Sequence, residues 1–309
     1  MAEVICVGSA VLEQVYDVPA LANGSEPLFA HAYRQAGAGT AANAAVAIAR
    51  LGGNALLWTR LGDDETGDLI VADLLRYAVD TSGVHRIAGA QSPLSSVIAA
   101  ADGRRQTTQF PGNGLPDDAG ALALGRIQDI GAVLTDPLWP AGARTALAAA
   151  REHRRPGLLA VGAMPEPLAG ALAGAAGYLV FTPDSLGRFS GETEVEAGLA
   201  AAAAATDAVV GVTDGADGFH WRRAGDDTPR SLPPVALPVV DPTGAWDAFC
   251  GAFALALGEE KPLETAIGFA VTEAGLTAAT SGGRRAMPDR RAVWRQFAAS
   301  FPTLSESDA

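Results

Sequence analysis

The chain of 309 residues contains only two cysteines and four histidines, and neither type recurs at the spacing of a disulfide framework or a zinc site. Cys6 and Cys250 each lie within an apolar run, so both are expected to be small, buried hydrophobic side chains. No stretch reaches the roughly 18 consecutive apolar residues of a transmembrane helix, and the N-terminus lacks the pattern of a signal peptide. These absences predict a cytoplasmic protein without a membrane span.

Positive charge is also scarce, because lysine occurs once, at Lys261, and the net charge is −13. That lysine does not follow a Gly-x-x-x-x-Gly pattern, so the chain has no P-loop and is not a P-loop NTPase. A chain this acidic argues against general nucleic-acid binding. A dinucleotide-binding dehydrogenase is disfavoured as well, because the turn after the first apolar run lacks the G-x-G-x-x-G pattern.

What the chain does contain is an alternation of short, β-branched runs with Ala- and Leu-rich helical stretches. This alternation predicts one α/β domain over residues 1–309, with a mostly parallel sheet covered on both faces. Ligands of such sheets bind at the carboxyl ends of the strands. The expected strands are 4–8, 55–60, 132–135, 158–161, 178–181 and 208–212, and the expected helices are 40–51, 66–78, 141–153, 165–172 and 195–205.

Two segments, residues 11–35 and 93–110, interrupt this alternation with short strands and turns. In the second segment Asp102-Gly103 separates two strand-like runs, which is a hairpin signal. The two segments together predict a small β-sheet that projects from the body, as a lid or as a dimer surface.

The segment Asp-Pro-Thr-Gly-Ala-Trp-Asp, residues 241–247, joins an extended run to an apolar helix. A helix N-terminus offers unpaired N–H groups and a partial positive charge, so the amides of Gly244, Ala245 and Trp246 could hold a phosphate. Asp247 in the first turn could accept the proton of a substrate hydroxyl, as phosphoryl transfer requires. The alternative is a first-turn carboxylate that only stabilises the helix dipole.

Four segments in this order together resemble the ribokinase family, the PfkB carbohydrate kinases. They are AGAGTAANAAVAIARLGG at 36–53, VVGVTDGADG at 209–218, DPTGAWDAF at 241–249 and GGRRAMP at 282–288. The resemblance covers most of the chain, and both ends look most similar to the sulfofructose kinase branch. It implies a ribokinase-like three-layer sandwich with a β lid, which often builds a homodimer. It also implies ATP-dependent phosphorylation of a hydroxyl on a small sugar or sugar-like substrate, with Mg²⁺, and with K⁺ as a further candidate cofactor.

The resemblance assigns roles to individual positions. Asp247 falls on the catalytic base, and the anion hole falls on Gly244, Ala245 and Trp246. The positions assigned to the sugar are Glu13, Gly37, Gly39, Asn43 and, on the lid, Arg105. The positions assigned to the nucleotide are Asp184, Thr213, Gly215, Gly218 and Gly283. No residue is assigned as a direct metal ligand.

The chain departs from the family pattern at several of these positions. Trp246 stands where the family has a glycine, and a glycine would allow the phosphate to approach the backbone more closely. Asp184 and Gly187 replace the Asn and Glu of a motif tied to Mg²⁺, and a helix N-cap is the alternative role for Asp184. Glu13 replaces an Asp that grips sugar hydroxyls. These departures leave open a catalytically impaired kinase-fold protein that still binds sugar or nucleotide, and a nucleoside kinase is a further alternative.

Other positions bear on the substrate. Pro27 and Leu138 stand where the sulfofructose branch would place cations, which argues against a sulfonated or phosphorylated sugar. Arg284 and Arg285 could each contact a phosphate or lie on the surface. Asp136 follows a predicted strand, so its carboxylate could face the cleft or cap the Asp-Pro turn.

Overall fold

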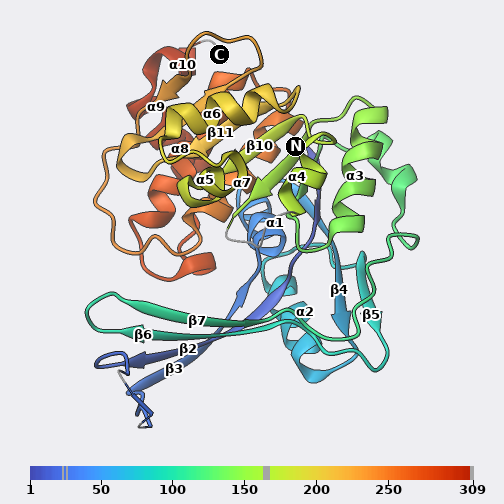
Figure 1. Cartoon of the computed structure of the whole chain (residues 1–309), viewed down its shortest axis with the longest axis vertical. Helices are drawn as coiled ribbons and strands as arrows, with labels where there is room; N and C mark the ends of the chain where they lie inside the picture. The colour runs from blue at the N-terminus through green and yellow to red at the C-terminus, as the bar shows by residue number, and fades with distance from the viewer. Residues whose placement is uncertain (23, 26, 163–167, 307–309) are drawn as a thin grey trace.

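The computed structural model describes residues 1–22, 24–25, 27–162 and 168–306, and it contains two separate β-sheets (Figure 1). Seven neighbouring strands of the larger sheet are parallel, and two antiparallel strands extend one edge. In spatial order these strands are β13 (Arg230–Leu232), β12 (Phe219–Arg222), β11 (Val209–Thr213), β10 (Tyr178–Phe181), β9 (Gly157–Val161), β8 (Ala132–Thr135), β1 (Glu3–Val7), β4 (Asn54–Gly62) and β5 (Val84–Ile87). The predicted mostly parallel sheet is confirmed.

Helices cover both faces of this sheet, because alternate residues of each strand point to opposite faces. Val4 and Cys6 of β1 belong to one core, and Ile5 and Val7 belong to another. The first face carries α1 (Thr40–Arg50), α2 (Glu65–Arg76), α7 (Ala245–Gly258), α8 (Leu263–Ala278), α9 (Arg290–Ser300) and α10 (Pro302–Glu306). The other face carries the 3-10 helix η1 (Leu124–Asp129), α3 (Pro140–Glu152), α4 (Leu168–Ala173), α5 (Pro183–Ser190) and α6 (Val195–Ala204). Two further short 3-10 helices are η2 (Gly215–Asp217) and η3 (Gly283–Arg285).

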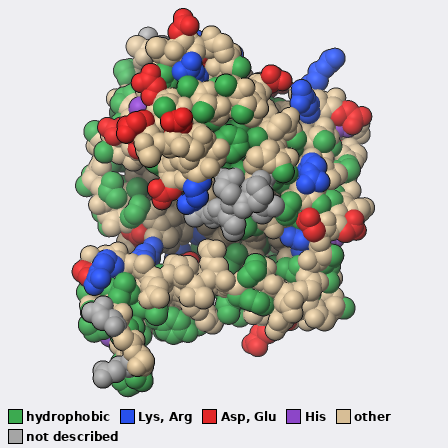
Figure 2. All heavy atoms as spheres, viewed as in Figure 1, with side chains coloured by type: hydrophobic (Ala, Val, Ile, Leu, Met, Phe, Trp, Pro, Cys, Tyr) green, Lys and Arg blue, Asp and Glu red, His purple; other side chains and the backbone are tan. Residues whose placement is uncertain are grey.

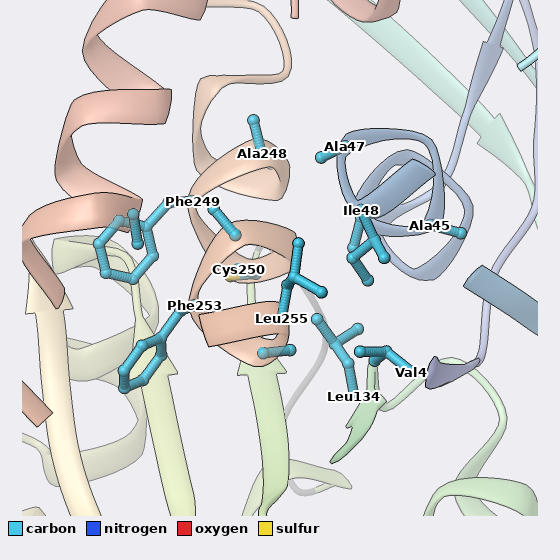
Figure 3. Close-up of a cluster of buried hydrophobic side chains, with 14 of the residues drawn as sticks. Val4, Ala45, Ala47, Ile48, Leu134, Ala248, Phe249, Cys250, Phe253 and Leu255 are labelled. Atoms are coloured by element: carbon cyan, nitrogen blue, oxygen red, sulfur yellow. The ribbon is translucent and has the colours of Figure 1, made fainter. Parts of the chain in front are cut away.

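Helices α1 and α7 pack backbone against backbone on the first face. A Cβ at Gly251 of α7 would lie 2.6 Å from the carbonyl oxygen of Ala44 in α1, so only glycine allows this approach. Figure 3 shows Leu255 of α7 beside Ile48 of α1 and Leu134 of β8, while Phe249 and Phe253 point to the other side of α7. The contact brings the N-terminal turns of the two helices to the same edge of the sheet.

The four-stranded sheet is the predicted lid, and it projects from the body (Figure 1). Its order is β3 (Ala32–Ala38), β2 (Val11–Val18), β6 (Leu94–Ala100) and β7 (Arg105–Phe110). The expected hairpin at Asp102-Gly103 is confirmed, since β6 and β7 pair antiparallel across that turn. Strand β2 pairs antiparallel with β3 but parallel with β6, an arrangement that the sequence did not indicate.

Most predicted elements are present with ends shifted by at most two residues. The helix predicted over 165–172 lies partly outside the described residues, and α4 begins at Leu168. Strands β5, β12 and β13 and helices α5, α9 and α10 were not predicted, and no bounds were predicted for α7 and α8. Within the described ranges, none of the helices has the length and apolar character needed to cross a membrane.

Asp136, directly after β8, is 2% exposed and its carboxylate accepts four hydrogen bonds. Oδ2 accepts from the backbone N of Ser9 at 2.8 Å, from its Oγ at 2.6 Å and from the amide of Ala41 at 3.0 Å. Oδ1 accepts from the amide of Leu138 at 2.9 Å, which confirms the turn-capping alternative. The carboxylate is therefore enclosed by protein donors and does not face the cleft; it ties β1, β8 and the start of α1 together.

Substitution Asp136→Asn should lower the free energy of unfolding by about 2–3 kcal/mol, because an amide nitrogen would face buried donors that now reach a charged acceptor. Thermal and denaturant unfolding of the purified variant measure this. The control is Asp207→Asn at an exposed position before β11, which should change stability by less than about 0.5 kcal/mol. Equal stability of the two variants would contradict the role given to Asp136.

Candidate active site

A cavity of about 750 Å³ lies between the lid and the body, at the carboxyl ends of the parallel strands. Figure 2 shows this face of the molecule hollowed between the two parts. The lid contributes Glu13, Ser95 and Arg105 to its wall, and the body contributes Asn43 and Asp247. The predicted base and the predicted sugar residues therefore share one cavity.

Asp247 lies in the first turn of α7 and accepts a hydrogen bond from Nδ2 of Asn43, with Nδ2 and Oδ2 2.5 Å apart. Burial raises the pKa of Asp247 to about 6, although hydrogen bonds from Asn43 and Thr40 and the charge of Arg284 act to lower it. The negative charge of Asp136 adds to the increase. A carboxylate with a pKa close to neutral is suited to accept a proton from a hydroxyl group.

The backbone before Asp247 forms the N-terminus of α7, with Gly244 at the N-cap and a φ of 80°. The amide of Ala245 donates to the carbonyl of Pro242 at 3.2 Å, so one of the three predicted anion-hole donors has a protein partner. In the described part of the chain, the amides of Gly244, Trp246 and Asp247 have no protein acceptor. These three amides are the donors that a phosphate could use without breaking a bond.

The side chain of Trp246 extends toward Gly162, at the carboxyl end of β9. A Cβ at Gly162 would lie 3.0 Å from the six-membered ring of the indole, so the two residues are in close contact. Trp246 also forms part of the cavity wall, and its Nε1 is buried without a hydrogen-bond partner among the described residues. The tryptophan thus keeps its backbone N–H at the helix start while its ring contacts the neighbouring strand end.

The five residues predicted to bind sugar all line the cavity. Ser95 Oγ is 3.4 Å from Glu13 Oε2, a long hydrogen bond between neighbouring lid strands. Gly39 has a φ of 95° and its missing Cβ leaves room for the carbonyl of Ser9, so the turn before α1 requires glycine. Arg105 of the lid donates to Oγ1 of Thr243 at 2.7 Å, which joins the lid to the loop before Gly244.

Of the residues predicted to bind nucleotide, Gly283 lines the cavity, whereas Asp184, Thr213, Gly215 and Gly218 are not part of its wall. Thr213 ends β11, Gly215 and Gly218 follow it, and Asp184 follows β10 at the same edge of the sheet. The N-cap alternative for Asp184 is wrong, because Thr182 caps α5 and accepts from the amide of Ser185 at 3.3 Å. Asp184 is instead an exposed carboxylate in the first turn of α5.

Sequence reasoning missed the polar residues behind the base. Arg284 is 6% exposed and forms an ion pair with Asp73 of α2, with Nη1 and Oδ2 2.7 Å apart. The surface alternative is therefore wrong for Arg284, whereas the phosphate-contact alternative stays a prediction, because Arg284 also lines the cavity. The side chain of Thr40 also donates a hydrogen bond to the Asp247 carboxylate. Asp73 lies within an amphipathic helix and carries no motif, so no signal in the sequence marked it.

Comparison with known proteins bears on these assignments. The profile of the pfkB family carbohydrate kinases matches residues 1–290. The ribokinase of Bacillus subtilis (strain 168) is 26% identical over 295 residues, which cover 95% of this chain and 98% of that protein. Fructokinase-1 of Oryza sativa subsp. japonica is 38% identical over 103 residues, which cover 33% of this chain and 31% of that protein.

Solved structures share the fold. The crystal structure of an Agrobacterium tumefaciens protein assigned as a ribokinase has a TM-score of 0.91 at 32% identity, covering 96% of this chain and 98% of that chain. Arabidopsis thaliana ribokinase complexed with ribose and ATP has a TM-score of 0.87 at 26% identity, with the same coverage of 96% and 98%. Sequence and fold agree, and this chain belongs to the pfkB family of carbohydrate kinases.

Proposed function

We propose that this protein transfers the γ-phosphoryl group of ATP to a hydroxyl of a small neutral sugar, with Asp247 as the general base. The observation that carries the proposal is the position of Asp247, which Asn43 holds next to the unpaired amides at the start of α7 in one cavity. The Arabidopsis relative was solved with ribose and ATP, which makes ribose the first sugar to test.

The reaction that this geometry supports has few steps. The hydroxyl gives its proton to the Asp247 carboxylate while its oxygen forms a bond to the γ-phosphorus. The bond from that phosphorus to the bridging oxygen breaks, and ADP leaves. The amides of Gly244 and Trp246 donate to the oxygens of the transferred group, where negative charge is held in the transition state.

The same cavity provides groups for the sugar. Glu13 can accept hydroxyl hydrogens from the lid side, where Gly37 of β3 also lies, and Gly39 and Asn43 line the cavity at the start of α1. Arg105 already reaches the anion-hole loop through Thr243, so a hydrogen bond joins the lid to the body at this edge of the cavity.

Magnesium would enter with the nucleotide and neutralise phosphate charge. No group of three His, Cys, Asp or Glu side chains suited to a metal occurs among the residues described. This suits an ion that keeps several waters and binds through phosphates and one carboxylate. Asp184, exposed after β10, is the carboxylate that we assign to it, and Thr213, Gly215, Gly218 and Gly283 are the residues that we assign to the nucleotide. We further assign K⁺ to the loop of Asp241, whose carboxylate accepts from the amides of Thr243 and Gly282.

The lid is also the surface that we assign to a homodimer. Tyr33 on edge strand β3 is 52% exposed, and Phe110 on edge strand β7 is 41% exposed. Edge strands with exposed aromatic side chains are usually covered, and a second lid would cover them.

Substitution Asp247→Asn should lower kcat by roughly 10²–10⁴-fold while sugar binding stays close to normal, because the amide cannot accept the hydroxyl proton. ADP release with Mg²⁺ and K⁺ across a panel of sugars and nucleosides measures turnover, and calorimetry measures binding. Asp207→Asn is the matched control. A variant with close to the wild-type rate would remove Asp247 from the mechanism.

If the wild-type protein binds sugar or nucleotide but gives no product, the catalytically impaired alternative replaces the kinase proposal. Trp246→Gly then decides its cause, since a large gain in turnover would identify the indole as the block. A nucleoside as the best acceptor in the panel would instead select the nucleoside kinase alternative.

The same Asp247→Asn variant should be more stable than the wild type above pH 7. The folded-state pKa of Asp247, about 6, is above the ordinary aspartate value of 3.8, so protonation favours the folded state and this stability is lost as the pH rises through 6. The gain on substitution should reach roughly 1–2 kcal/mol at pH 8, because the carboxylate borders an open cavity, and should almost vanish at pH 4. Thermal melts from pH 4 to 8 test this, and a gain independent of pH would contradict it.

A further inference from the structure

One buried guanidinium connects the predicted base to three other elements. Arg284 of η3 donates from Nε to Oδ1 of Asn43 at 2.5 Å and from Nη1 to Oδ2 of Asp73 at 2.7 Å. Its Nη2 donates to the carbonyl of Ala38 at 3.0 Å, at the end of β3. A continuous chain of hydrogen bonds therefore runs from Asp73 through Arg284 and Asn43 to Asp247.

The chemistry of this chain fixes the orientation of the Asn43 amide. A guanidinium can only donate hydrogen bonds, and an ionised carboxylate can only accept them. Asn43 must therefore turn its oxygen toward Arg284 and its NH₂ toward Asp247. Without Arg284 the amide would lose the partner that selects this orientation, and the carboxylate of Asp247 would lose a fixed donor.

The sugar-side turn is shaped around the same group. A Cβ at Gly37 would overlap the guanidinium of Arg284 and the carboxylate of Asp73. Arg284 itself belongs to the turn of Gly283, which we assign to the nucleotide. The guanidinium thus spans the space between the nucleotide side and the sugar side of the cavity.

We propose that Arg284 is a positioning residue, which orients Asn43 and through it the carboxylate of Asp247. This role rests on the proposed function, because Asp247 is the proton acceptor of that reaction. Arg284 acts through Asn43 and the turn at Ala38, and it is not assigned a contact with the reacting atoms.

The charges around Asp247 predict how the pH dependence of the reaction changes when Arg284 is replaced. Asn43 and Thr40 of α1 donate to the carboxylate, and Arg284 of η3 is the attractive charge near it. Asp136 after β8 is the repulsive charge, and Cys250 lies one turn further along α7. Removal of Arg284 leaves the repulsion and the burial in place, so the pKa of Asp247 must rise.

Arg284→Gln should therefore lower kcat at pH 7 by roughly 10- to 100-fold and move the acidic limb of the pH–rate profile upward by roughly one pH unit. Arg284→Lys keeps the charge but not the planar fork, so it should lower kcat while the acidic limb stays in place. The control is Arg76→Gln, at an exposed position on α2, which should behave as the wild type.

An unchanged kcat and pH profile in folded Arg284→Gln would overturn the proposal. A lower kcat with an unchanged acidic limb would overturn it too, because that is the result of a purely structural role. If Arg284→Gln does not fold, Asp73→Asn provides the test, since it removes the carboxylate that neutralises the guanidinium: the positive charge acting on Asp247 then increases, and the acidic limb should move downward. An Asp73→Asn profile equal to the wild type would then count against the proposal.

A titration separates this proposal from the proposed function. The ¹³C resonance of the Asp247 carboxyl, followed against pH without substrate, should have its midpoint roughly one pH unit higher in Arg284→Gln than in the wild type. If the wild type phosphorylates no acceptor, the proposed function fails, but this midpoint still decides whether Arg284 controls Asp247. Equal midpoints in the two proteins would overturn the role of Arg284.

Discussion

The close contact of α1 and α7 is the constraint on which the rest of the site depends. Gly251 lets the backbone of α7 reach the carbonyl of Ala44, and alanine fills most of the facing surface of α1. Two helices at this distance have little freedom to slide. Their first turns therefore meet at a fixed separation, and Asn43 reaches Asp247. The packing of α1 against α7 in the core therefore also sets the geometry of the site.

Two aspartates at this edge of the sheet do opposite work because their surroundings differ. Asp136 receives four protein donors and is almost fully buried, and it stabilises the junction of β1, β8 and α1. Asp247 receives fewer donors, so burial raises its pKa. A carboxylate that is incompletely satisfied in the folded state retains affinity for a proton, and this is the property that a general base needs.

The sequence predicted the buried parallel strands well, because burial on both faces imposes continuous apolar runs, and it predicted α1, α2, α3 and α6 but not the extent of α8 or the presence of α9. It missed β12 and β13, which are short edge strands with mixed side chains, and α5, whose Thr182 cap follows a strand directly. The site residues within glycine-rich turns were assigned through the resemblance to the ribokinase family. Arg284 was a candidate, but its role behind the base could not be predicted, because its partners Asp73 and Asn43 lie more than 200 residues away in the sequence and only the tertiary fold brings them together.

The tryptophan at the start of α7 has an optical consequence. Trp58, Trp139 and Trp221 are almost fully buried in the two faces of the body, and Trp294 packs among the aromatic rings of Phe269 and Phe297. Trp246 instead borders the cavity, with its indole against a strand end and its backbone at the helix start. A change in tryptophan fluorescence when a ligand fills the cavity is therefore expected to come from Trp246. This indole would report directly on occupancy of the cavity.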